Sequence, residues 1–212
     1  MGTNFRIIDL GVILAGIGCM TVVLTAGFNS SNTAYRIKCQ DNLKKIGVAL
    51  SGYASKNNDV LPVVNDRDNW KKIWCLENSF VTYLRLKPHA GTRAKGNVLE
   101  CPGESRYETF THIGYVMNVN LHTADSKNPK HRRGGKLSYF SSPSTTIAAT
   151  DGTMHLLDTW KANNDKNNVT RARHDNQLNV LLLDGSVTTV PQILSNLDGY
   201  DKKNSWLSDE DK

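Results

Sequence analysis

An uncharged apolar run near the N-terminus constrains this chain more than any other feature. It extends from Leu10 to Phe28, and its 19 residues include no Asp, Glu, Lys or Arg. As a helix rising about 1.5 Å per residue, the run would span roughly 28 Å, close to the hydrocarbon thickness of a bilayer. A helix also satisfies its own backbone hydrogen bonds, as lipid requires. We therefore predict a transmembrane helix over residues 10–28, preceded by a short segment, 1–9.

A cleaved secretory signal peptide is the main alternative for this run. Such a peptide has a basic leader, a shorter apolar core and a small-x-small cleavage site. Residues 1–4 contain no Lys or Arg, and the run is too long, although Thr25-Ala26-Gly27 is a poor version of such a site. These features favour a retained anchor. At the head of the run Asp9 would lie at the interface, where a carboxylate costs little.

After Phe28 the pattern becomes amphipathic, with apolar residues at three- and four-residue steps. The apolar stripe consists of Tyr35, Cys39, Leu43, Ile46, Leu50 and Tyr53. Capping residues at 29–33 favour a break or a bend there, and Asn57-Asn58-Asp59 followed by Pro62 ends the pattern. We predict an amphipathic stem helix over residues 29–57 lying on one globular domain, 58–197. A polar tail, 198–212, follows.

A β-hairpin gives the clearest tertiary signal. Asp184-Gly185 separates the apolar run 180–183 from residues 186–190, a pattern typical of a two-residue type I′ turn. In that register Leu182 opposes Val187, and this face is expected to pack on the stem. Further strands are expected at 115–119 and 147–150. The predicted fold class is α+β: a long N-terminal helix, transmembrane in its first half and amphipathic in its second, packed against a C-terminal antiparallel β-sheet.

The net charge of +6 belongs to the part of the chain after the apolar run. Much of this positive charge lies in one Gly-containing segment, 127–136. The basic residues of that segment are Lys127, Lys130, His131, Arg132, Arg133 and Lys136. An acidic polysaccharide or another polyanion could bind there, although a solvated loop is the simpler interpretation. No aromatic residue interleaves with these cations, which argues against a nucleic-acid groove.

Several acids and histidines could in principle form an acid/base or metal cluster: Asp151, Asp158, Asp175, Asp184, His155 and His174. Asp151 and Asp184 each precede Gly in an expected turn, where the side chain caps its own backbone. His174 can hydrogen-bond across the hairpin. The chain has no G-x-S-x-G, P-loop, H-E-x-x-H or C-x-x-C motif. We therefore predict a non-enzymatic protein without catalytic residues, metal or cofactor.

Segments along most of the chain resemble, in order, the type IV pilins and type II secretion pseudopilins. Phe5-Arg6-Ile7-Ile8-Asp9 leads the apolar helix, and residues 36–50 follow in the family's pattern. A narrower resemblance comes from the spacing near the C-terminus, where nine residues separate His174 from Asp184-Gly185. This pattern is similar to that of the prepilin-type proteins with an H-x9-DG C-terminal domain. Cys101-Pro102, residues 114–118 and residues 148–152 occur in the same order as in that family.

The resemblance implies a structural subunit of an envelope filament or a type II secretion-type apparatus. Such a protein is anchored in the bacterial inner membrane, and its domain faces the periplasm or the cell exterior. Its partners would be the lipid bilayer, copies of itself or other pilin-like subunits, and the secretion or pilus assembly machinery. The basic residues that follow the apolar run, at 36–45, would by charge alone place the domain in the cytoplasm. Exported pilin-like proteins commonly carry such residues, so we expect export.

Two positions depart from the family pattern. Family leaders end in Gly before the Phe, whereas Asn4 precedes Phe5 here, and Asp9 occupies the position of a family Glu. We therefore expect inefficient cleavage before Phe5. In a filament Asp9 could neutralise the N-terminal amine of a neighbouring subunit in the low-dielectric core. A retained leader would remove that pairing.

The cysteines allow at most one disulfide outside the apolar run, which contains Cys19. Family members carry both the Cys39 and the Cys101 positions, so the resemblance implies a bridge that clamps the stem to the domain. Cys75 with Cys101 is the alternative. Either loop is long enough for a bridge to stabilise the fold by a few kcal/mol.

Two other functional classes remain open at this point. One is an anchored periplasmic or surface module that binds an anionic glycan through Lys130, Arg132, Arg133 and Lys136. The other is an anchored hydrolase that uses the region of His174.

Overall fold

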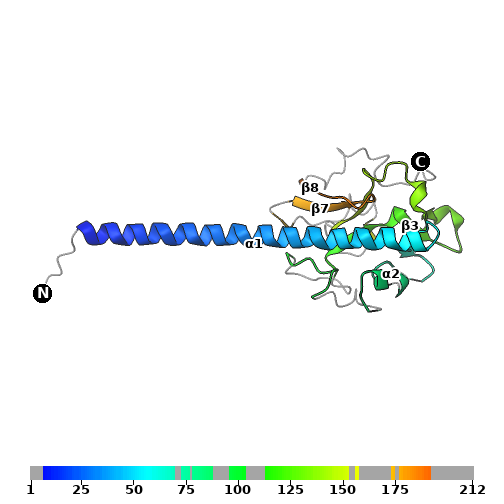
Figure 1. Ribbon diagram of the computed structural model, residues 1–212, viewed down its shortest axis with the longest axis horizontal. Coiled ribbons are helices and arrows are strands. Elements are labelled where there is room, and N and C mark those ends of the chain that lie inside the picture. Colours follow the sequence, from blue (N-terminus) through cyan, green and yellow to red (C-terminus); the bar gives the residue numbers. More distant parts are fainter. Residues whose placement is uncertain are drawn as a thin grey trace.

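The computed structural model describes residues 7–69, 73–76, 78–87, 96–103, 113–152, 156–157, 173–174 and 177–191. It describes only the backbone at residues 7–31, 78, 131, 133, 156–157 and 191. One long helix, α1 (Ile7–Lys56), projects from a globular head that surrounds its C-terminal part (Figure 1). Residues 1–6 of the expected N-terminal segment 1–9 and the polar tail lie outside the described residues, whereas residues 7–9 belong to α1. Within the described part of the chain, no helix combines the length and the hydropathy of a membrane span.

Helix α1 runs for 50 residues without the break expected at 29–33. Capping residues inside a helix cost only fractions of a kcal/mol each, so strong helical segments on both sides can propagate through them. The helix ends where Asn58 and Asp59 adopt the left-handed conformation, with φ of 53° and 70°. The backbone N–H of Asp59 donates to the carbonyl of Ala54 at 2.9 Å. This termination agrees with the expected end of the stem.

The head contains a five-stranded sheet in the order β6-β2-β5-β7-β8. Its strands are β2 (Tyr115–Asn118), β5 (Ile147–Asp151), β6 (Leu156–Leu157), β7 (Gln177–Leu182) and β8 (Val187–Pro191). All neighbouring strands are antiparallel except β2 and β6. The prediction of a helix combined with an antiparallel sheet is thus confirmed, as are the strands expected at 115–119 and 147–150.

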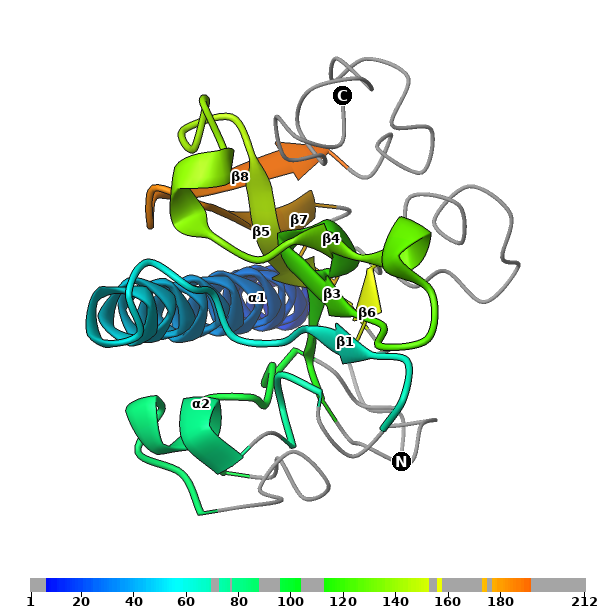
Figure 2. The ribbon, with the colours of Figure 1, turned by 90° about the vertical axis from the view of Figure 1, so that its right-hand side faces the viewer.

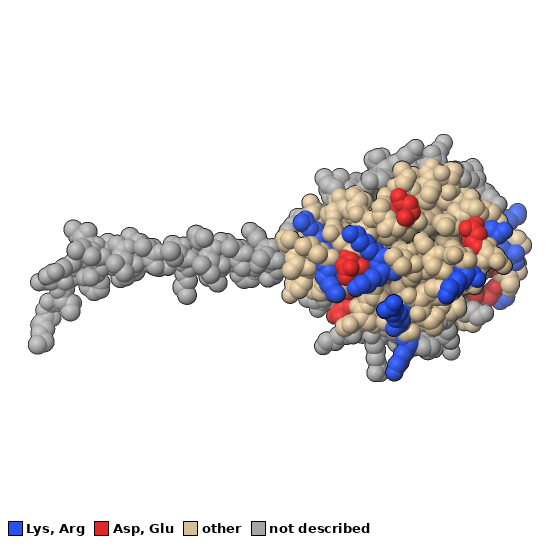
Figure 3. All heavy atoms as spheres, viewed as in Figure 1, with Lys and Arg blue, Asp and Glu red and all other residues tan. Residues whose placement is uncertain are grey.

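Smaller elements close the head around α1. A second sheet has the order β1-β3-β4 and comprises β1 (Asn65–Asp66), β3 (His122–Ala124) and β4 (Arg133–Gly134). The short helices are α2 (Asn78–Tyr83) and the 3-10 turns η2 (Val119–Leu121), η3 (Pro129–His131) and η4 (Leu137–Tyr139). Viewed along α1, strands β7 and β8 lie on one side of the helix and α2 on the other (Figure 2). Basic and acidic side chains are interspersed on the face seen in Figure 3.

One stripe of α1 forms the centre of the core, as the sequence periodicity predicts. Cys39, Leu43 and Ile46 are fully buried, and Leu50 is 3% exposed. Tyr35 departs from the prediction because it is 44% exposed. It lies one helical turn before Cys39, the first buried residue of the stripe. The head therefore begins to cover the helix at about this turn.

Strand β7 lies alongside α1 and runs in the same direction. Near its start, the Arg36 guanidinium donates to Gln177 Oε1 at 3.0 Å, and Gln40 Nε2 donates to the Thr189 hydroxyl of β8 at 2.8 Å. Further along, a Cβ added at Gly47 would approach Leu181 Cδ1 to 2.9 Å and Gly185 Cα to 3.3 Å. The hairpin thus contacts the helix over about three turns, and a methyl group at the closest approach would require the Leu181 side chain to shift.

The turn of this hairpin is not the predicted type I′ turn. Of its two central residues only Gly185 has a positive φ, 89°, whereas a type I′ turn needs both. The Gly185 N–H donates to the Leu182 carbonyl at 3.0 Å, and the Leu182 N–H donates to the Ser186 carbonyl at 2.8 Å. The loop therefore has three residues, 183–185. Asp184 Oδ1 accepts from the Ser186 N–H and hydroxyl and stabilises this geometry.

The longer loop shifts the pairing register by one residue. Leu181, and not Leu182, is opposite Val187. Since side chains alternate along a strand, a shift of one residue exchanges the two faces. Leu181 is fully buried in the core that contains the α1 stripe, whereas Leu182 is only half-buried. The prediction that Leu182 packs on the stem is wrong for this reason.

Two glycines of α1 provide a matched test of this packing. Gly47→Ala should destabilise the fold by up to about 2 kcal/mol, because overpacking of the contact with Leu181 and Gly185, about 1–3 kcal/mol, outweighs the helix preference of alanine, about 1 kcal/mol. Gly52→Ala should stabilise it by about 0.5–1 kcal/mol, since its Cβ would lie 3.6 Å from Tyr83 and alanine favours the helix. Urea unfolding of both variants measures the difference. Equal effects at both positions would contradict the proposed contact.

Candidate functional site

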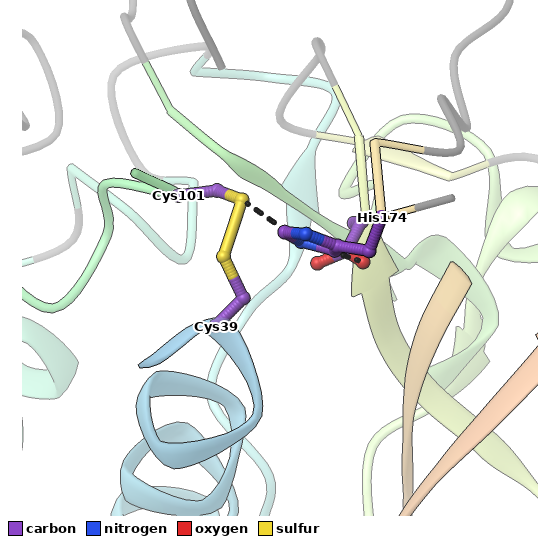
Figure 4. A group of neighbouring side chains, drawn as sticks. Cys39, Cys101 and His174 are labelled. Atoms are coloured by element: carbon purple, nitrogen blue, oxygen red, sulfur yellow. Dashed lines mark hydrogen bonds and ion pairs between the residues drawn. A yellow bond between two sulfur atoms is a disulfide. The ribbon is translucent and has the colours of Figure 1, made fainter. Parts of the chain in front are cut away.

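A disulfide joins α1 to the loop that precedes β2. It links Cys39 and Cys101, whose Cα atoms are 5.4 Å apart and which are separated by 62 residues in sequence. Figure 4 shows the bridge between the helix and the loop, with the imidazole of His174 beside it. This is the pairing that the family resemblance implied. Cys75, the partner in the alternative pairing, is a free and buried thiol, and burial holds its pKa far above the ordinary value.

Neighbouring polar contacts hold the loop on the helix. Asn42, one turn after Cys39, donates from Nδ2 to the Glu100 carbonyl at 2.9 Å and to the Tyr115 hydroxyl at 3.1 Å. Any side chain at Gly114 would collide with the backbone nitrogen of Cys101. The Gly114 N–H in turn donates to the Leu99 carbonyl at 2.8 Å. The bridge is thus embedded in a close junction of α1, the loop and the start of β2.

His174 and Asp151 lie against the disulfide on the side of the sheet. His174 Nε2 is 3.5 Å from Cys101 Sγ and 3.8 Å from Asp151 Oδ2 (Figure 4). The side chains of His174 and Asp151 are 1% and 0% exposed. Gly103 packs on the imidazole, because a Cβ there would approach His174 Cε1 to 2.8 Å. The ring is therefore held between the loop and the strands.

Burial dominates the electrostatics of Asp151. Its Oδ2 accepts a hydrogen bond from the Asn179 N–H at 2.8 Å, while its Oδ1 has no hydrogen-bond partner among the described residues. Desolvation raises the pKa of this carboxyl to about 7, against the opposing effects of the Asn179 hydrogen bond and the Arg173 charge. The prediction that Asp151 caps its own turn is wrong, because it is the last residue of β5 and its carboxyl points into the junction.

Arg173 places a positive charge beside this cluster. Its guanidinium donates to the Gly114 carbonyl at 2.9 Å and to the Gly152 carbonyl at 2.6 Å. These two carbonyls belong to the start of β2 and the end of β5, which are neighbouring strands. Arg173 therefore joins the two strands at the edge where the disulfide, Asp151 and His174 meet.

The cluster combines a disulfide, an imidazole and a carboxylate in a fully buried site. The sulfur, nitrogen and oxygen atoms of Cys39, Cys101, Asp151 and His174 all lie within 4.8 Å of one another. While the sulfurs are bonded to each other, the arrangement acts as a covalent clamp. Reduction would leave four potential metal ligands together.

The structure separates the two parts of the H-x9-DG signature. His174 lies at the disulfide, whereas Asp184 and Gly185 form the hairpin tip beside Gly47. Asp184 caps the turn, as predicted. Phe5 lies outside the described residues, as do Asp158, Asp175 and His155. Asp9 lies in α1, and only its backbone is described.

The basic residues at 127–136 do not form a common anion site in the described part of the chain. Lys130 is exposed on η3, and Lys136 Nζ lies 5.8 Å from the centroid of the Tyr139 ring. Arg132 donates from Nε to the Asp125 carbonyl at 2.8 Å. Carboxylates line the hollow of about 350 Å³ beside Arg132, namely those of Asp66, Asp68 and Asp125. Of Arg133 only the backbone, in β4, is described.

Comparisons of the chain with protein-family models, with curated proteins and with solved structures found no match.

Sequence reasoning considers Asp151 and His174 as members of a possible cluster but favours separate structural roles for them, and it misses their contact with the disulfide. The information that brings these residues together is the antiparallel pairing of β5 with β7. In such a pair the C-terminal end of one strand lies beside the N-terminal end of the other. Asp151 ends β5 and His174 lies three residues before the start of β7, so knowledge of this pairing would have placed them near each other.

The disulfide predicts a redox-dependent stability. Reduction should lower the free energy of unfolding by about 4 kcal/mol, since the bridge closes a loop of about 62 residues. Reduction should not further destabilise the Cys39→Ala/Cys101→Ala double variant, whereas Cys75→Ala should keep the full redox effect. Peptide mass spectrometry without reduction should recover Cys39 linked to Cys101. Recovery of Cys75 linked to either residue would contradict this pairing.

The burial of the Asp151 carboxyl predicts that the stability of the fold decreases as pH rises. Between about pH 4 and 7, the folded chain retains a proton on Asp151 that the unfolded chain loses, so stability falls as pH rises. The Asp151→Asn variant lacks this proton and should gain stability relative to the wild type across that range, by an amount on the order of 4 kcal/mol. Urea unfolding of both proteins at pH 5 and pH 8 measures the part that falls between these values, about 3 kcal/mol. A difference independent of pH would show that the carboxyl titrates normally.

Proposed function

We propose that this chain is a non-enzymatic, pilin-like structural subunit, held by a single membrane anchor in an envelope filament or a type II secretion-type apparatus. One observation carries the proposal. A continuous helix of 50 residues has its C-terminal part built into a folded head, while the apolar run 10–28 lies in the part that projects. The predicted anchor and the stem are therefore sections of one rigid rod.

The attachment of the head to the stem supports a mechanical role. Cys39 joins the helix covalently to the loop, and the hairpin packs on Gly47 two turns further along. A load applied to the stem would be carried by a covalent bond and by a packed core. A module that only binds a ligand would not need so stiff an attachment.

The outer face of the stem supports association with another helix. Ile37 is 59% exposed and Val48 is 74% exposed. These residues are 11 positions apart, close to three helical turns, and therefore share one face of α1. Beside Val48 is a hollow of about 400 Å³, whose lining includes Tyr83, Leu84 and Val98. Two exposed apolar side chains on one helix face, with the Asp41–Lys45 ion pair between them, suit packing against a neighbouring subunit.

The environment of His174 argues against the hydrolase alternative. Its imidazole is 1% exposed and faces a disulfide sulfur. A general base must come within hydrogen-bond reach of a proton on the substrate or on an attacking water. In this conformation the surrounding protein fills the space beside the imidazole that a substrate or a water would need.

Membrane retention tests the anchor. The double variant Ile17→Arg/Met20→Arg should release the protein from membranes washed at alkaline pH, because each arginine stays charged there and costs about 2.5–3.5 kcal/mol near the centre of a membrane helix. The matched control, Ile37→Arg/Val48→Arg, adds the same charges to exposed positions of the same helix and should stay in the membrane. Release of the unmodified chain by the same wash would overturn the anchor.

Processing and orientation test the rest of the proposal. External protease added to spheroplasts should digest the head, and a protected head would contradict export. N-terminal sequencing of the membrane-extracted protein should find most chains uncleaved before Phe5. A free or methylated amine at Phe5 would instead show efficient processing and strengthen the assignment to a filament.

A further inference from the structure

Four potential metal ligands converge at the junction of stem and head, each from a different part of the chain. Cys39 comes from α1, Cys101 from the loop before β2, Asp151 from the end of β5, and His174 from the residues before β7. All four are buried. Two thiolates, an imidazole and a carboxylate make up a ligand set suited to Zn²⁺.

We infer that the dithiol form of this chain binds one Zn²⁺ ion through Cys39, Cys101, Asp151 and His174. Every chain is synthesised with free thiols, so the dithiol form precedes the disulfide. Zinc binding replaces the two thiol protons and the proton that the buried Asp151 carboxyl holds below about pH 7, and these protons are released to solvent. Subsequent thiol–disulfide exchange with an external disulfide transfers two electrons to that disulfide, forms the bond between Cys39 and Cys101, and releases the metal.

The S···N distance matches a tetrahedral ion and the N···O distance is about 0.5 Å longer than in one, so modest side-chain shifts would complete the site. With Zn–S of about 2.3 Å and Zn–N of about 2.0 Å, a tetrahedral site has an S···N edge of about 3.5 Å. The observed distance from Cys101 Sγ to His174 Nε2 is 3.5 Å. The N···O edge of such a site is about 3.3 Å, and His174 Nε2 lies 3.8 Å from Asp151 Oδ2. After reduction the sulfurs need to separate to about 3.8 Å, which rotation of the cysteine side chains can supply.

The charges also balance around a divalent cation. Two thiolates and the Asp151 carboxylate carry three negative charges in a buried site, and Zn²⁺ with the nearby Arg173 guanidinium neutralises them. Asp151 Oδ1 is buried and has no hydrogen-bond partner among the described residues, so a cation would compensate a carboxylate that is otherwise poorly solvated. The Asn179 N–H already orients this carboxylate through Oδ2.

Four protein ligands in a closed site are typical of structural zinc. The ion would hold α1 to the loop and the sheet at the same place where the disulfide later holds it. Metal and disulfide are therefore mutually exclusive clamps on one junction. This inference goes beyond the filament proposal, because zinc binding by the purified chain does not require assembly.

Cobalt substitution tests the site in the full-length chain in detergent, after reduction with a phosphine and removal of metal. Titration with Co²⁺ should produce the visible bands of a tetrahedral ion and a thiolate-to-cobalt charge-transfer band, saturating at one ion per chain. Zn²⁺ should displace these bands, and the oxidised chain should not give them. Absence of the bands in the reduced chain, or equal binding by the oxidised chain, would overturn the inference.

Variants identify the ligands. Asp151→Asn and His174→Gln should each weaken binding at least about tenfold, since even residues that only support metal ligands have effects of that size. Cys75→Ala is the matched control, because Cys75 is a buried thiol outside the cluster, and it should leave the spectrum and the stoichiometry unchanged. Loss of the cobalt bands in Cys75→Ala would assign the metal to a different site and overturn the inference.

Alkylation of the unmodified chain gives a result that does not depend on variants folding. Zn²⁺ should slow the reaction of iodoacetamide with both Cys39 and Cys101 in the reduced protein, as measured by peptide mass spectrometry. The rate at Cys75 should not depend on zinc beyond the general stabilisation seen for the other peptides. Unchanged rates at Cys39 and Cys101 would show that zinc is not bound there.

Discussion

The junction of α1 with the loop before β2 is the point on which the head depends. The core is arranged around one stripe of the helix that begins at Cys39, and Cys39 is also the residue that carries the covalent bond to Cys101. From Cys101 the chain must reach β2, and Gly114 allows the strand to approach the bridge closely. The order of the sheet follows from there, because β5 and then β7 pair outward from β2.

The parts of the fold that depend on local periodicity were predictable from the sequence. The three- and four-residue spacing of Leu43, Ile46 and Leu50 identifies the buried face of the helix. Alternation within 115–119 predicts β2, and the short apolar run at 147–150 predicts β5. The hairpin register was not predictable in the same way. Asp-Gly suits both a two-residue type I′ turn and a three-residue loop with glycine in the left-handed position. One residue of loop length decides which leucine of β7 meets the stem.

The site depends on contacts between distant segments, and these are only partly encoded in local patterns. The cysteine pair followed from a resemblance, and His174 was singled out as part of a motif. Asp151 was interpreted as a turn residue because it precedes a glycine. Its role follows from strand pairing, which brings the end of β5 to the start of β7. Periodicity within one strand carries no information about which strand lies next to it.

The unbroken course of α1 through residues 29–33 couples the angular position of the head to the sequence of the stem. The hairpin is attached to the helix near Arg36 and again at Gly47, so the head cannot turn about the helix axis independently of the rod. Each residue of an α-helix adds a rotation of about 100° and a rise of about 1.5 Å. The number of residues between the apolar run and Cys39 therefore sets both the height of the head and the direction that its surface faces. An insertion of one residue there would turn the head through more than a quarter of a circle while hardly changing its height.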